Sequence, residues 1–113
     1  MADIPVLFSR WEAFTGWVLN HTQKFPRRTR HTLANRIDNL LLDVYEALVE
    51  ARYSRQRLPI LKQINLELEK LRLFLRLAHT QRFLAHQSFA YACNELEEIG
   101  RMVGGWIKQQ EPL

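Results

Sequence analysis

Residues 59–80 read PILKQINLELEKLRLFLRLAHT and show the pattern that decides the fold. Apolar side chains recur there at steps of three and four, at Leu61, Ile64, Leu68, Leu71, Leu75 and Ala78. Because an α-helix turns once in about 3.6 residues, these side chains share one face. Pro59 suits the first turn of a helix, where its missing N–H leaves no hydrogen bond unmade. The segment therefore predicts a long amphipathic helix that buries one face.

Three further segments have the same periodicity, and short connections separate them. The predicted helices cover about residues 5–24, 28–53, 59–80 and 86–108. Short connections make consecutive helices antiparallel neighbours. A length of 113 residues also fits one ordinary domain. The sequence thus predicts an all-α protein, an antiparallel up-down-up-down four-helix bundle that forms a single domain over residues 1–113.

The composition excludes several classes of protein. Hydrophobic residues make up 47% of the chain and charged residues 25%, which is the balance of a globular protein. The single cysteine, Cys93, excludes a disulfide framework and a Cys-based zinc site. No apolar run approaches the roughly 20 residues that span a bilayer, and the N-terminus has no signal-peptide core. We therefore expect a cytoplasmic protein that does not associate with membranes.

No group of residues indicates catalysis or metal binding. The Glu-x-x-His pairs of di-iron bundles and the Gly-rich loops that bind phosphates are absent from the sequence. Cys93 falls on the apolar face of the last predicted helix, where a cysteine behaves as a small buried hydrophobe. We expect no cofactor, no metal ion and no enzymatic activity.

The two middle helices carry a second apolar face, opposite the first. A helix in a monomeric bundle needs only one apolar stripe, and an exposed second stripe commonly marks an interface. The residues of this second face are Leu42, Tyr45, Val49, Tyr53, Leu66, Leu73 and Leu77. The pattern favours a homo-oligomer that assembles through these residues. The alternatives are a wider core and leucines scattered over the surface.

Basic residues gather in three windows that contain no acid. The net charge is +4, and residues 24–36, 52–62 and 70–82 hold most of the 16 lysines and arginines. In an antiparallel bundle the first window and the end of the third meet at one end. We predict that arginines there bind phosphates of a nucleic-acid backbone, without reading its sequence. The candidate phosphate-binding residues are Arg27, Arg28, Arg30, Arg72, Arg76 and Arg82.

Two alternatives explain the same charges without a ligand. A basic small protein can owe its charge to solubility alone. Arginines near helix C-termini also complement the helix dipole, which would account for Arg52 and Arg76. That explanation does not cover Arg27, Arg28 and Arg30, which the predicted helix over 28–53 places at an N-terminus, where positive charge is unfavourable.

Several stretches of the chain resemble one protein family. They are Arg36-Ile-Asp-Asn-Leu, Glu50-Ala-Arg-Tyr-Ser54, Leu68-Glu-Lys-Leu-Arg72, Leu75-Arg-Leu-Ala-His79 and Gly100-Arg-Met-Val-Gly-Gly-Trp106. The chain resembles the accessory variability determinant (Avd) proteins of diversity-generating retroelements, from about Trp11 to Gln109. Four-helix proteins encoded in ribosomal RNA intervening sequences are similar to a lesser degree.

The resemblance implies a fold, an assembly and partners. Avd proteins are four-helix bundles that form homopentameric barrels, bind the retroelement's reverse transcriptase together with RNA and DNA, and support mutagenic cDNA synthesis without known catalytic activity. The positions that match the family's motifs are expected at its surface, where they are candidates for binding the polymerase or nucleic acid: Arg36, Arg52, Arg72, Arg76 and His79.

Three functions remain open from the sequence. The leading interpretation is an oligomeric accessory scaffold that brings RNA or cDNA to a reverse transcriptase. The second is a basic nucleic-acid-binding bundle of the intervening-sequence type, with no polymerase partner. The third is a protein-interaction scaffold whose arginines serve solubility, and an enzyme is the least favoured class.

Overall fold

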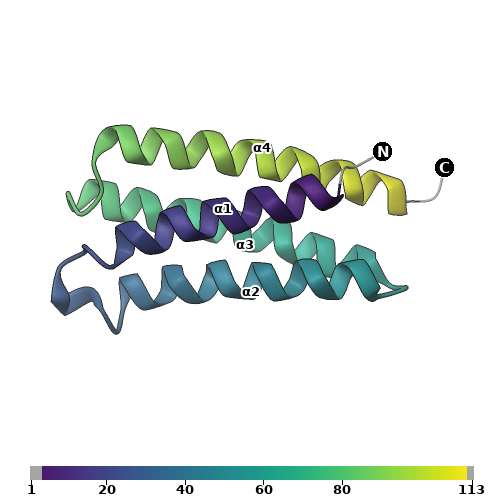
Figure 1. The fold of residues 1–113 in the computed structure, drawn as a ribbon, viewed down its shortest axis with the longest axis horizontal. Coiled ribbons are helices and arrows are strands. Elements are labelled where there is room, and N and C mark those ends of the chain that lie inside the picture. The colour runs from purple at the N-terminus through teal and green to yellow at the C-terminus, as the bar shows by residue number, and fades with distance from the viewer. Residues whose placement is uncertain (1–3, 112–113) are drawn as a thin grey trace.

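The computed structural model describes residues 4–111 and contains four long helices (Figure 1). They are α1 (Ile4–Thr22), α2 (Leu33–Tyr53), α3 (Arg57–Thr80) and α4 (His86–Gln110). A short 3₁₀ helix, η1 (Arg27–Thr29), lies between α1 and α2. No strand occurs within residues 4–111. The predicted all-α fold with four helices is confirmed.

Each helix packs against the helices before and after it, and α1 also packs against α4. The chain reverses direction at every connection, so that the helices run up and down in turn (Figure 1). One end of the bundle is formed by residues 23–32 and by residues 76–85, which include the end of α3, and we call it the basic end. The opposite end holds residues 54–56, the start of α1 and the end of α4, and we call it the terminal end.

The core face predicted for residues 59–80 is confirmed, because all six of its residues are buried. In α2 the same periodicity predicts a core face of Leu33, Ile37, Leu40, Val44, Leu48 and Ala51, which is correct in part. Leu33 and Leu40 are half-buried, whereas their neighbours Ala34 and Leu41 are buried. In α4 the predicted burial of Cys93 is wrong, because Cys93 is half-buried and the adjacent Ala92 is buried instead. Adjacent residues lie about 100° apart on a helix, so periodicity alone does not choose between them.

The start of α2 differs from the prediction. Instead of a helix from residue 28, the chain forms η1, and α2 begins at Leu33. Thr29 is buried in this connection, and its hydroxyl donates to the carbonyl of Pro26 at 2.8 Å. The argument that Arg27, Arg28 and Arg30 lie in the unfavourable field of a helix N-terminus is therefore wrong, since that field acts only over the first turn.

The other helix bounds are close to those predicted. The first and last helices are shifted or extended by two residues or fewer at their ends. The third helix begins at Arg57, which places Pro59 within its first turn. Two hydrogen bonds from the Arg57 guanidinium explain the tight connection: Nε donates to the Ser54 carbonyl at 3.0 Å, and a terminal nitrogen donates to the Arg52 carbonyl at 3.2 Å.

Candidate nucleic-acid interface

The basic end is built from two connections that touch through aromatic rings. The ring centroids of Phe25 and Phe83 lie 5.9 Å apart, and the Arg28 guanidinium carbon lies 5.5 Å from the Phe83 centroid. Residues 24–36 and the end of residues 70–82 therefore meet, as predicted. Phe83 contacts the Arg28 guanidinium by a cation–π interaction, and the Arg28 side chain remains exposed to solvent.

Arg82 has an unusual backbone conformation for its residue type. Its φ angle is +65°, in the left-handed region. The Phe83 N–H donates to the Ala78 carbonyl at 2.8 Å, and the Arg82 N–H donates to the His79 carbonyl at 3.0 Å. These two bonds form the Schellman motif that ends a helix, at whose left-handed position glycine is preferred. An arginine there destabilises the fold by roughly 1 kcal/mol, and it places a guanidinium at the tip of the basic end.

His79 is packed more closely than a surface position. Its ring stacks on Phe89 with centroids 4.9 Å apart, and it lies 5.4 Å from the ring of His86. His79 is half-buried and His86 is exposed. The pair joins the end of α3 to the start of α4, so His79 helps to position this end of the bundle.

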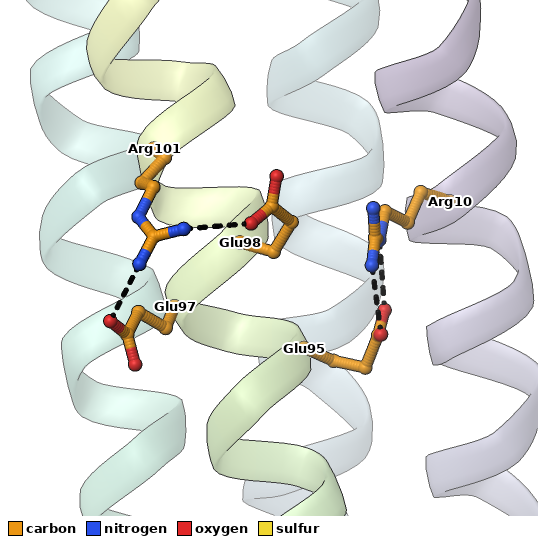
Figure 2. Close-up of polar contacts among 5 residues, drawn as sticks. All are labelled: Arg10, Glu95, Glu97, Glu98 and Arg101. Atoms are coloured by element: carbon orange, nitrogen blue, oxygen red, sulfur yellow. Dashed lines mark hydrogen bonds and ion pairs between the residues drawn. The ribbon is translucent and has the colours of Figure 1, made fainter.

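Most ion pairs lie away from the basic end. Arg10 on α1 donates two hydrogen bonds of 3.0 Å to the Glu95 carboxylate on α4. Arg101 forms ion pairs with Glu97 and Glu98 within α4 (Figure 2). Within residues 4–111, no ion pair joins a basic residue of the basic end to an acid. The exposed cations left without an acid there are Lys24, Arg27, Arg28, Arg30, Arg76 and Arg82.

Arg72 and Arg76 are not equivalent, although they are one turn apart. Arg72 pairs with Glu69 on its own helix, and Glu97 of α4 lines the same surface depression. Arg76 is exposed and has no such partner within the described residues. Arg72 therefore presents less net positive charge than Arg76.

Arg36 and Arg52 lie outside the basic cluster. Arg36 lines a groove of about 550 Å³ between α2 and α3, together with Lys70 and Leu73. Arg52 lies near the terminal end of a molecule 47 Å long, with its guanidinium carbon 5.9 Å from the rings of Phe8 and Tyr53. The structure thus brings together only part of the predicted set.

The second apolar face is exposed at six of its seven predicted positions. Leu73 is 54% exposed and Tyr53 is 79% exposed, and the other exposed members are Leu42, Val49, Leu66 and Leu77. Tyr45 is the exception, because it is half-buried beside α1 and its hydroxyl donates to Glu12 at 2.8 Å. That hydrogen bond, with a smaller effect of burial, raises the pKa of Tyr45.

The exposed residues form two matching stripes. On α2 the stripe is Leu42, Glu46, Val49 and Tyr53, and on α3 it is Leu66, Lys70, Leu73 and Leu77. Both have steps of four, three and four, which keep residues on one line along a helix. Each stripe has one charged residue at its second position, an acid on α2 and a base on α3.

A family model described as bAvd-like matches residues 5–110. The chain belongs to the bAvd-like family. The match confirms the resemblance found in the sequence and covers all four helices. Membership of this family suggests an accessory role and association with a reverse transcriptase. No curated protein matches the chain.

Other features of this bAvd-like protein bear on chemistry. Burial raises the pKa of the half-buried Cys93 thiol, which makes it a weaker nucleophile at neutral pH. Over residues 4–111 no three His, Cys, Asp or Glu side chains are grouped so that they could hold a metal ion. In that same part of the chain no helix is both long and apolar enough to cross a bilayer.

Sequence reasoning missed one part of the basic end. A polar pocket of about 370 Å³ lies beside η1 and includes Asp38, the acid nearest in sequence to the arginines of η1. The sequence signal was available, since Asp38 is the first acid after a long stretch without one. Its contact with Thr22 on α1 could not be read from spacing.

Proposed function

We propose that this protein is a non-catalytic accessory scaffold of a diversity-generating retroelement. It binds the reverse transcriptase and the RNA or cDNA, and so supports mutagenic cDNA synthesis. The observation that carries the proposal is the set of exposed cations at the basic end that no described acid neutralises. Membership of the bAvd-like family supports the choice of a reverse transcriptase as the partner.

Phosphate backbones are the ligands that fit such an end. Each cation there is exposed, and Arg76, Arg82 and Arg28 come from separate segments. Phosphate contacts of this kind give affinity that falls steeply with salt, because binding releases counterions. His79 and Phe83 stabilise the surface that carries the arginines.

We further propose that copies of the chain assemble through the two stripes. The α2 stripe of one protomer packs on the α3 stripe of the next, so that the stripe with the acidic Glu46 meets the stripe with the basic Lys70. This pairing joins two different surfaces, so it closes into a ring if the rotation allows. The family resemblance supplies the number five. A ring of five would repeat the basic end five times and add weak phosphate contacts by multivalency.

The test is co-expression with the reverse transcriptase of a diversity-generating retroelement, followed by co-purification. We expect the wild-type protein to copurify with the polymerase and with RNA. Arg76→Ala with Arg82→Ala should reduce the bound RNA, whereas Arg55→Ala, which removes an exposed arginine at the terminal end, should not. Undiminished RNA in the double variant would refute the assignment of the basic end.

The intervening-sequence type of nucleic-acid binding is the second candidate. The basic end favours this candidate equally, because its free cations can bind nucleic acid whether or not a polymerase is present. The same experiment separates the two: RNA that binds tightly without any copurified polymerase would favour the second candidate.

A further inference from the structure

A polar pocket opens at the basic end, where α1 ends, η1 follows and α2 begins. Its volume of about 370 Å³ is within the range of roughly 300–1,000 Å³ that small ligands occupy in proteins. Phe25 and Ala34, each 7% exposed, supply apolar lining. Arg27 and Arg30 supply cations at its rim, and Asp38 supplies a carboxylate.

Asp38 keeps unused capacity to accept hydrogen bonds. Its Oδ1 accepts from the Thr22 hydroxyl at 2.7 Å, and within residues 4–111 no other hydrogen bond or ion pair reaches it. An ionised carboxylate has about four acceptor positions, so most remain open. Partial burial raises the pKa of Asp38, and the hydrogen bond from Thr22 opposes that shift.

The pocket therefore combines cations that have no anionic partner with a carboxylate that can accept further hydrogen bonds. Arg27 and Arg30 line it without pairing to Asp38, so they lack an anion, while Asp38 accepts from Thr22 alone. A nucleotide of a single strand suits both kinds of group at once, because its phosphates are anionic and its base edge can donate. Bases of single strands are commonly splayed out and bound by their Watson–Crick edges.

We propose that this pocket holds a guanine base of single-stranded nucleic acid, with Asp38 accepting from N1–H and the exocyclic amino group and Arg27 and Arg30 on the flanking phosphates. Guanine suits a carboxylate because these two donors are adjacent. Adenine and cytosine place one amino group beside an acceptor nitrogen, and uracil places its N3–H between two carbonyl oxygens that a carboxylate repels. The proposal rests on the proposed nucleic-acid binding and adds a base preference to it.

The test compares a short oligouridine with the same oligonucleotide carrying one central guanosine. Fluorescence anisotropy at low salt should show the guanosine oligonucleotide binding wild-type protein about fivefold more tightly or better, as a bidentate contact to a base discriminates. Asp38→Asn retains an oxygen to accept from Thr22 and should bring the ratio of the two affinities close to one. Asp43→Asn removes the same charge elsewhere on α2 and should leave the ratio unchanged.

Guanosine and uridine monophosphates as competitors test the unaltered protein, in case Asp38→Asn does not fold. Stronger competition by the guanosine nucleotide supports the pocket. Equal affinities of the two oligonucleotides, or a guanosine preference that survives Asp38→Asn, would overturn the pocket while leaving backbone binding intact. If neither oligonucleotide binds at low salt, the proposed function fails together with the pocket. Asp38→Asn is also tested for co-purification with the polymerase. If this variant loses the polymerase while the ratio of the two oligonucleotide affinities stays unchanged, Asp38 binds a basic side chain of the polymerase, and the guanine pocket is overturned.

Discussion

The two ends of the bundle use arginine in opposite ways. At the terminal end, Arg57 donates to two backbone carbonyls and Arg52 lies against aromatic rings. At the basic end, Arg27, Arg30 and Arg82 have no acid partner among the described residues. Both ends are basic in sequence, but only one has most of its guanidinium groups free for a ligand. Local charge therefore identifies candidates, and the contacts of each guanidinium decide which are available.

Among these tests, disrupting assembly should cause the largest loss of RNA affinity at the basic end. Leu73→Glu introduces a charge into the α3 stripe, where it would be buried without a partner in an interface. Light scattering should give about five times the 13.5 kDa chain mass for wild type and a smaller mass for the variant. RNA affinity should fall at least about 100-fold, because multivalency is lost. Unchanged helical content by circular dichroism controls for folding, and a wild-type mass of one chain would refute the interface.

Removing three arginines from each end should then separate the two roles. The triple Ala variant of Arg27, Arg76 and Arg82 should bind RNA more weakly, with a salt slope lower by about two, since each lost contact to a single strand removes roughly 0.7. The triple Ala variant of Arg52, Arg55 and Arg57 carries the same charge change and should keep most of the slope. Equal losses in both variants would show that net charge, and not the basic end, determines binding.

A single substitution at the terminal end should measure how much Arg57 stabilises the fold. Arg57→Ala removes the hydrogen bonds to the carbonyls of Ser54 and Arg52 and should lower the free energy of unfolding by roughly 1 kcal/mol. Arg55→Ala, which removes an exposed neighbour, should change it little. Denaturant unfolding of both variants provides the measurement. Equal stabilities would contradict the role assigned to Arg57.

Arg82 allows stability and binding to be separated at one position. Arg82→Gly should raise the free energy of unfolding by roughly 1 kcal/mol, because glycine adopts the left-handed conformation without strain. The same change should weaken RNA binding, since the guanidinium is lost. Arg82→Ala should weaken binding to the same degree without the gain in stability. A glycine variant that is more stable and binds RNA as well as wild type would show that Arg82 is not a ligand.

Part of the site could be predicted from sequence because it depends on local spacing. The exposed stripe of Leu66, Leu73 and Leu77 follows from helical periodicity, and so does its separation from the core face. The start of α2 was misjudged because the hydroxyl of Thr29 and the backbone of residues 26–30 form a turn that competes with helix. The pairing of Arg72 with Glu69 was within reach of the sequence, since residues three apart are neighbours on a helix.

The sequence by itself determined the four helices, the core face of α3 and the gathering of positive charge, since each depends on residues close together along the chain. Only the tertiary structure decided which of Leu40 and Leu41 is buried, that Phe83 meets Arg28 and Phe25, and that Thr22 bonds Asp38. Those contacts join residues from different elements, and their geometry depends on how the helices pack and where each connection ends. Charge can be counted along a chain, but whether a charged group is available to a ligand depends on what folding places beside it.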